Sequence, residues 1–213
     1  MRKNSVNKEN NNFVFKIIAI GDSGVGKTSI IRKYLYNIFE PTTINTIGLS
    51  FSFKEVILKN KTKVKLKIMD TAGQEKYNSL TKTYYKNADG VLFVFDINNK
   101  KSFDSLQKWM ELFNENNNGK KIIPIYLLGN KCDLERKVEQ ESIDKFIKET
   151  DFKYREMSAF KDDETKFSEV FQSMAETLYS LEMENMNNSQ KGIKVSKYKY
   201  KQSNESKCEL CAN

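Results

Sequence analysis

The stretch Gly21–Thr28 constrains this chain more than any other, because it places glycines, a lysine and a hydroxyl at a fixed spacing: Gly-Asp-Ser-Gly-Val-Gly-Lys-Thr. The preceding run, Phe13–Ile20, is rich in β-branched and aromatic residues and predicts a strand. Apolar residues at helical spacing follow in Ser29–Leu35 and predict a helix. A strand, a glycine-rich turn and a helix are the context in which the pattern G-x-x-x-x-G-K-[ST] binds phosphate.

This turn carries the chemistry that a phosphate ligand requires. Its glycines let successive backbone N–H groups turn toward an anion, and the helix N-terminus adds unpaired donors and partial positive charge. Lys27 is expected to reach β- and γ-phosphates, and the Thr28 hydroxyl to bind Mg²⁺. The motif alone also fits a glycine-rich connection with an incidental lysine, but the flanking strand and helix favour phosphate binding.

Composition sets limits on the rest of the chain. Its 213 residues suit one domain with tails, and no apolar run approaches the ~20 residues of a membrane span. The Asn-rich segment 1–12 is expected to be a disordered arm and not a signal peptide, and Arg2 stands where N-myristoylation needs glycine.

The charged and reactive residues exclude some functions. The three cysteines do not form a disulfide framework, which indicates a reducing compartment, and the absence of histidine excludes histidine-based catalysis and histidine metal sites. The net charge of +8 indicates an anionic partner. Nucleic acid is the least favoured, since the basic residues are scattered or lie near the end, without an aromatic reading surface.

Beyond the first helix, strand and helix patterns alternate, which predicts an α/β fold with a mostly parallel six-stranded sheet and helices on both faces. Further strands are predicted at Leu49–Leu58, Thr62–Met69, Gly90–Asp96, Ile122–Leu128 and Phe152–Met157, and helices at Ser102–Asn114, Ser142–Lys148 and Lys166–Leu181.

Local features refine this pattern. The lysines at 63, 65 and 67 alternate with apolar residues, which predicts an antiparallel pair at a sheet edge, with lysines on the edge strand. Ser102 is expected to cap its helix, and Trp109 to pack rather than to bind.

Polar motifs follow three of the predicted strands, where α/β sheets bind their ligands. These are Asp70–Glu75 (DTAGQE), Asn130–Asp133 (NKCD) and Ser158–Ala159. Taken alone, NKCD also fits an exposed polar turn, and Thr46 in the preceding loop region fits an ordinary loop hydroxyl. The position of NKCD after a buried strand favours a functional role.

With these motifs in order, the chain resembles the Ras superfamily of small GTPases over Phe13–Leu181, and within it the Rab family. The resemblance implies a P-loop NTPase fold, a three-layer G domain in residues 13–181 with one antiparallel edge strand. The Rab-like segments are Ile47–Phe51, Lys65–Met69, Lys76–Thr81, Tyr84–Ala88 and Val94–Asn98.

The resemblance implies roles around the phosphates and Mg²⁺. Thr46 would give a second hydroxyl to Mg²⁺ and sense the γ-phosphate, and Asp70 would hold Mg²⁺ through water. Gly73 would donate its N–H to the γ-phosphate, and Gln74 would orient the attacking water. The residues that would cradle the phosphates are Ser23, Gly24, Val25, Gly26, Lys27, Thr28 and Ser29.

The resemblance also implies a guanine site. Asp133 would accept from N1–H and the exocyclic amine, a pair that adenine does not present. The flanking positions would complete the site: Phe39 packing on the base, Asn130 and Lys131 buttressing the loops and covering the ring, and the Ser158–Ala159 backbone meeting O6.

A Rab-like chain is expected to be a switch that hydrolyses GTP slowly, since no arginine finger is evident in cis, and that regulates vesicle traffic. Its expected partners are guanine nucleotide, an exchange factor, a GTPase-activating protein, effectors and escort proteins of the GDI type. The alternatives are a nucleotide-binding scaffold with little turnover, which Lys27, Thr28, Thr46 and Gln74 disfavour, and an ATP-using enzyme, which Asp133 disfavours.

Two positions depart from the Rab pattern. Met69 stands where Rabs usually carry Trp, in a trio with the positions of Phe51 and Tyr84, and this puts effector specificity in doubt. Phe160 replaces the usual Lys after Ser158–Ala159.

The segment 182–213 is expected to be a flexible basic tail. Its lysines at 191–201 would attract an anionic leaflet. The resemblance to Rabs implies that one or both of Cys208 and Cys211 are prenylated, which would place the chain in the cytoplasm and on the cytosolic face of an intracellular membrane. The two cysteines lack the usual Rab spacing, and Leu210 stands where a C-a-a-X box needs Cys. Two free thiols, or less plausibly half of a zinc site, are the alternatives.

Overall fold

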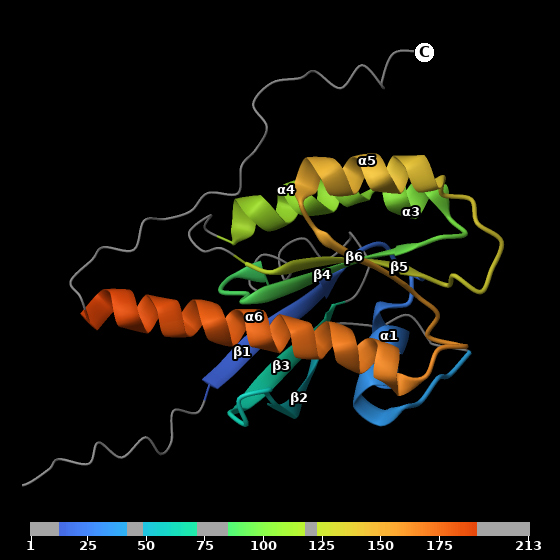
Figure 1. Cartoon of the computed structure of the whole chain (residues 1–213). Coiled ribbons are helices and arrows are strands. Elements are labelled where there is room, and N and C mark those ends of the chain that lie inside the picture. Colours follow the sequence, from blue (N-terminus) through green and yellow to red (C-terminus); the bar gives the residue numbers. More distant parts are fainter. Residues whose placement is uncertain (1–12, 42–48, 72–84, 118–122, 191–213) are drawn as a thin grey trace, which may run out of the picture.

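The computed structural model describes residues 13–41, 49–71, 85–117 and 123–190, and these form one six-stranded sheet with helices on both faces (Figure 1). Its strands are β1 (Phe13–Ile20), β2 (Leu49–Ile57), β3 (Lys63–Thr71), β4 (Gly90–Asp96), β5 (Ile125–Asn130) and β6 (Lys153–Met157). Its helices are α1 (Lys27–Tyr36), α3 (Lys100–Asp104), α4 (Leu106–Asn116), α5 (Gln140–Thr150) and α6 (Glu164–Gln190).

The strand order is β2-β3-β1-β4-β5-β6, with β2 antiparallel to β3 and every other pair parallel. This confirms the predicted α/β architecture with one antiparallel edge strand. The order places the carboxyl ends of β1, β3, β4 and β5 at the same edge of the sheet. Loops that leave these ends are therefore brought together, although their residues lie far apart in the sequence.

The sheet separates two hydrophobic clusters. On one face α1 and α6 pack against residues such as Ile17 and Leu92, and on the other α3, α4 and α5 pack against their neighbours Ile18 and Phe93 (Figure 1). Successive residues of a strand point to opposite faces, so a strand covered on both sides is apolar throughout. This accounts for the uninterrupted apolar sequence of β4, whose residues are all buried.

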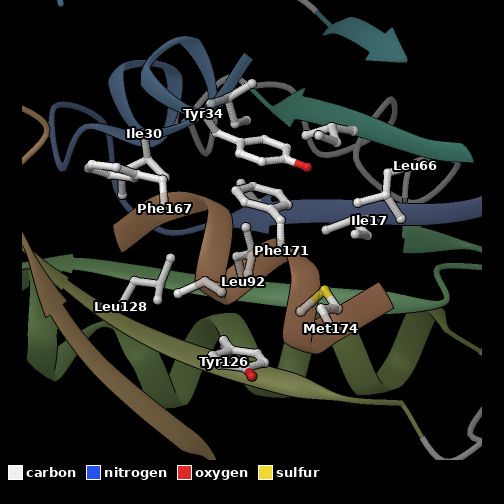
Figure 2. Packing of buried hydrophobic residues seen from close by; sticks show 14 of the residues in the cluster. Ile17, Ile30, Tyr34, Leu66, Leu92, Tyr126, Leu128, Phe167, Phe171 and Met174 are labelled. Carbon is white, nitrogen blue, oxygen red and sulfur yellow. The ribbon is translucent and has the colours of Figure 1, made fainter. Parts of the chain in front are cut away.

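The α1–α6 layer is fixed by an aromatic stack. The rings of Tyr34 in α1 and Phe171 in α6 lie parallel, with centroids 3.8 Å apart (Figure 2). Lys54 of β2 donates to the Tyr34 carbonyl oxygen at 2.5 Å and pairs with Glu164 at 3.2 Å. These contacts hold the end of α1 against the start of α6.

The predicted position of the β3 lysines is corrected by the strand order. The apolar residues Val64, Leu66 and Ile68 are buried and the lysines between them are not, as the alternation predicts. However, β3 lies between β2 and β1, so the lysines are not on an edge strand. Two of them stand beside exposed rings of β2 instead: Lys67 Nζ lies 4.7 Å from the ring centre of Phe51 and Lys65 Nζ lies 5.6 Å from that of Phe53. Lys63 pairs with Glu55 of β2.

The helix predicted from Ser102 to Asn114 is wrong at its start and in its continuity. The structure has α3 and α4 in its place, and the residue before α3 is Asn99. Ser102 does not cap a helix. Its Oγ donates to the Asn99 carbonyl at 2.7 Å and accepts from Asp96 N at 3.0 Å, so the buried hydroxyl fastens the turn that leaves β4.

The last helix continues to Gln190, past the predicted end at Leu181. The predicted flexible tail from 182 therefore begins with helical residues. The physical reason is local: Glu and Met are good helix formers, and the first glycine beyond Leu181 is Gly192. Among the described residues, none of the helices has the length and apolar character needed to cross a membrane.

Candidate functional site

The loop between β1 and α1 closes around the ammonium group of Lys27. This side chain is 5 % exposed, and its Nζ donates to the carbonyl oxygens of Gly21 and Asp22, each at 2.7 Å. An ammonium group has three N–H donors, so one remains for an anion beyond these two acceptors. Burial lowers the pKa of Lys27 to about 8, against the opposing effect of the nearby Asp70 and Asp22 carboxylates.

Two glycines of this loop are required by close approach. A Cβ on Gly21 would lie 2.1 Å from the Val94 carbonyl oxygen, and one on Gly26 would lie 2.2 Å from Asn130 Nδ2. Gly26 also precedes α1 with φ +96°, a conformation that side chains other than glycine rarely adopt. The loop therefore lies directly against β4 and against the end of β5.

A carboxylate and a hydroxyl meet beside this loop. Asp70, near the end of β3, is 5 % exposed and accepts a hydrogen bond from the Thr28 side chain. Burial raises the Asp70 pKa, while the Thr28 hydrogen bond and the charges of Lys27 and Arg32 oppose this rise. Within the described part of the chain, Asp70 Oδ1 is a buried polar atom without a hydrogen-bond partner. A hard cation with oxygen ligands fits this pair, because it would offset the burial of the carboxylate.

Asn130, the last residue of β5, joins three loops. Its side chain is 2 % exposed; Nδ2 donates to the Val25 carbonyl at 2.8 Å, and Oδ1 accepts from Ala159 N at 3.2 Å. Both ends of the amide are thus used inside the protein. The glycine-rich loop, the NKCD motif and the Ser158–Ala159 motif are held in a fixed relation by this one residue.

The neighbouring polar residues are also paired with one another. Ser158 Oγ donates to Asp133 Oδ1 at 2.5 Å, which fixes the orientation of the Asp133 carboxylate. Lys131, in a left-handed conformation with φ +62°, pairs with Asp96 at 2.6 Å. Asp162 accepts from the Ser158 backbone N at 2.7 Å.

Two aromatic rings lie beside these polar groups. Phe39 follows α1 and Phe160 follows Ser158–Ala159, and their ring centroids are 5.2 Å apart at an interplanar angle of 53°. Phe160 is 59 % exposed, while Phe39 packs in part against the core. A flat apolar ligand placed at Asp133 would find aromatic surface next to a carboxylate.

Most of the predicted site residues lie within the described residues. The structure brings together Val25, Lys27, Thr28, Asp70, Asn130, Asp133, Ser158 and Ala159 through the contacts above. It places Ser23, Gly24, Gly26 and Lys131 on the same loops, Ser29 in the first turn of α1 and Phe39 after the end of α1. Five lie outside the described residues: Thr46, Gly73, Gln74, Cys208 and Cys211.

Sequence reasoning missed three partners of these residues. Asp96, at the end of β4, pairs with Lys131, and Asp162 holds the Ser158 backbone. Trp109 is buried, as predicted for a packing residue, but its indole also donates to Asp22. No local pattern marks the Asp96–Lys131 and Trp109–Asp22 pairs, because each joins segments that only the strand order brings together. Asp162 and Ser158, in contrast, lie four residues apart in one loop.

Comparison with known proteins agrees with this geometry. The Ras family model matches residues 16–180. Ras-related protein Rab-13 of Bos taurus is 42 % identical over 164 residues, which cover 76 % of this chain and 78 % of the relative. Rab-10 of Caenorhabditis elegans is 42 % identical over 148 residues, 68 % of this chain and 72 % of the relative. Rab-11B of Dictyostelium discoideum is 38 % identical over 192 residues, 86 % of each chain.

The family model covers most of the chain, and the relatives match along most of their own length. The loops that the strand order gathers are also the ones whose motifs resemble this family. The chain therefore belongs to the Ras family and is a Rab-like small GTPase, a GTP-hydrolysing switch of membrane trafficking.

Proposed function

We propose that this GTPase binds GTP and GDP with Mg²⁺ among the loops that follow β1, β3, β5 and β6, and that the γ-phosphate decides which partners it binds. The observation that carries the proposal is the Asn130 side chain, which ties the glycine-rich loop to both motifs beyond β5. A ligand that contacts the glycine-rich loop and also these two motifs needs phosphates for the loop and a base for the motifs.

We call Gly21–Thr28 with Asp70 the phosphate half of the site. Lys27 would donate its remaining N–H to the β- and γ-phosphates, while loop N–H groups and the start of α1 bind the other phosphate oxygens. Thr28 and Asp70, with Thr46, would hold Mg²⁺, Asp70 acting through water. When bound, the ion supplies positive charge that neutralises phosphate oxygens.

We call Asn130–Asp133 with Ser158–Phe160 the base half. Ser158 holds the Asp133 carboxylate, which would accept from guanine N1–H and from the exocyclic amine. Adenine lacks that pair of donors, so its binding would leave the acceptor unsatisfied. Phe39 and Lys131 would cover the ring, and the Ser158–Ala159 backbone would meet O6.

Hydrolysis would depend on residues near the γ-phosphate. Gln74 would orient the attacking water and Gly73 would donate its N–H to the γ-phosphate; both lie outside the described residues. Turnover is expected to be slow without an activating protein that brings an arginine. Release of phosphate would remove the contacts that Thr46 and Gly73 make, so the loops that carry them would change partner affinity.

The chain would meet its regulators and membranes through two further regions. Effectors, an exchange factor, an activating protein and a GDI-type escort would bind the switch loops and adjoining β2–β3 surface, where Phe51 is 54 % exposed and Met69 is buried. The lysines at 191–201, with lipid on Cys208 and Cys211, would hold the protein on the cytosolic face of an intracellular membrane. Residues 13–181 would act as the G domain and 1–12 as an arm.

Nucleotide binding and turnover test this proposal. Protein stripped of nucleotide should bind labelled GDP saturably in the presence of Mg²⁺, with GTP but not ATP competing. Single-turnover hydrolysis should slow in Gln74→Leu while GTP affinity stays nearly intact. Binding without any turnover, even with candidate activating proteins, would instead favour a scaffold.

Localisation tests the tail. A tagged chain should be found on a membrane, and the variant in which both Cys208 and Cys211 become serine should be released from it. Mass spectrometry that finds unmodified cysteines in protein from its native cell would contradict prenylation.

A further inference from the structure

The chain has a single tryptophan, Trp109, and it contacts the glycine-rich loop. Trp109 lies in α4 and is 4 % exposed, and its Nε1–H donates to Asp22 Oδ1 at 2.7 Å. The two residues are 87 positions apart in sequence. A buried indole N–H needs an acceptor, and here the acceptor is a carboxylate of the loop itself.

Asp22 is tied at two points. Its side chain accepts from Trp109, and its backbone carbonyl accepts from Lys27 Nζ at 2.7 Å. The residue therefore links a helix on one face of the sheet to the ammonium group inside the loop. A bond to a charged acceptor is stronger than one between neutral groups, so the restraint on the loop is substantial.

The body of the indole is also fixed. Trp109 belongs to the same buried cluster as Ile18 and Ile20, which lie near and at the end of β1, the strand that leads into the loop. Leu106 and Phe113 pack in this cluster from the same helix. The indole N–H is thus held in place by core packing, and its position does not depend on the hydrogen bond to Asp22.

We propose that Trp109 is a positioning residue for nucleotide binding: through Asp22 it restrains the glycine-rich loop in the conformation whose N–H groups face the phosphates, and so it slows nucleotide release. The inference rests on the proposed function, because it assumes that this loop binds phosphate. It concerns the phosphates alone, so base selectivity should be independent of Trp109.

The sharpest test removes the donor and keeps the shape. Because Trp109 is the sole tryptophan, the full chain can be made with β-(3-benzothienyl)alanine in its place, which has sulfur where the indole has N–H. The dissociation rate of labelled GDP should rise about fivefold to tenfold, which is less than the full effect of losing a hydrogen bond to a charged group, because the indole acts on the nucleotide only through the loop. The preference for GTP over ATP should not change.

Substitutions at Asp22 separate positioning from packing. Asp22→Ala should raise the GDP dissociation rate to a similar degree, and Asp22→Asn, which keeps an acceptor oxygen, should lie closer to the native rate. In the chain that carries both Asp22→Ala and the tryptophan analogue, the rate should match that of either single change. Phe113→Leu, in the same helix and cluster, is the packing control and should change the rate less than twofold.

The outcomes are distinguishable. If the native chain binds no guanine nucleotide, the proposed function fails. If it binds GDP, but the analogue releases GDP at the native rate or the two changes are additive, the positioning role of Trp109 is overturned while the proposed function stands. Melting temperatures measured with GDP bound show whether each variant is folded at the temperature of the rate measurement.

Discussion

In the phosphate half of the site a buried ammonium group with a lowered pKa lies close to a buried carboxylate with a raised pKa, and one carboxylate oxygen has no described partner. In the base half the polar side chains bond to one another: Asn130 to Val25 and Ala159, and Ser158 to Asp133. In the phosphate half, the charged groups still need partners that a ligand would supply. In the base half, most polar side chains already have hydrogen-bond partners before a ligand binds.

This difference teaches how one site can combine tight binding with selectivity. Buried, incompletely compensated charge costs stability in the free protein and is offset when phosphate and a cation bind. A prearranged acceptor such as Asp133 does not reorganise, so it discriminates between bases. Variants of the phosphate half should therefore change affinity, and variants of the base half should change selectivity or the stability of the free protein.

The largest effect is expected for Lys27→Met. Loss of charge-assisted hydrogen bonds to the phosphates should weaken GTP binding about a thousandfold, or about 4 kcal/mol. The free energy of unfolding without nucleotide should change by less than about 1 kcal/mol, because the substitution also removes a buried charge. Calorimetric titration and urea unfolding measure the two quantities. A large loss of stability with little loss of affinity would break the comparison.

Asp133→Asn should weaken GTP binding about a hundredfold, because the amide keeps one acceptor and turns an N–H toward a donor of guanine. Xanthosine triphosphate, which presents an oxygen where guanine has its amine, should gain affinity relative to GTP. Competition against labelled GDP gives both values. The bond from Ser158 can persist with the amide oxygen, so the melting temperature serves as the control; an unchanged order of nucleotides would contradict the assigned role.

Asn130→Ala should act mainly on the free protein. It leaves the Val25 carbonyl and the Ala159 N–H, both in buried residues, without their partner. The free energy of unfolding without nucleotide should fall by about 2 kcal/mol. Urea unfolding beside Lys27→Met makes the comparison direct: if the Lys27 variant loses more stability than the Asn130 variant, the base half is not the preassembled one.

The smallest effect is a dependence on pH. Lys27 has a pKa of about 8 in the folded protein against an ordinary value of 10.5, and bound phosphate should raise it. GDP affinity should therefore be constant below about pH 8 and fall above it, by at most about tenfold per pH unit.

The stability of the free protein should show the opposite trend. Between about pH 8 and 10.5 the unfolded chain binds more protons than the folded one, so the free energy of unfolding should rise with pH. Titrations of affinity and stability check both trends, and neither contribution should persist in Lys27→Met. An affinity that does not fall between about pH 8 and pH 9 would contradict the lowered pKa.

Local patterns predicted much of this molecule. Two strands, Phe13–Ile20 and Gly90–Asp96, have the predicted bounds, because an apolar run between turn residues has clear ends. Helix ends were less predictable. Ser102 has the residue type of a cap but bonds to Asn99 and Asp96, and nothing in its own turn shows that Asp96 N needs an acceptor.

The site residues also divide into those that a local pattern predicted and those whose contacts it did not. Lys27, Thr28 and Asp133 were predicted because their chemistry lies in short contiguous motifs. The sequence did not predict the bond between Trp109 and Asp22, because it joins α4 to the loop after β1 across 87 positions of the chain. A contact between residues so far apart in sequence is set by packing and strand order.

The sequence by itself determined which groups are available: a loop of glycines with one lysine, a carboxylate near the end of β3, an amide at the end of β5 and a carboxylate just beyond it. It determined them because phosphate binding and base recognition need particular residues at short spacing. The tertiary structure decided their surroundings, namely the burial that lowers the Lys27 pKa, the Asn130 bonds and the indole beside Asp22. The physical reason is that burial and long-range hydrogen bonds depend on which strands are neighbours, and neighbouring strands are chosen by the packing of the whole sheet.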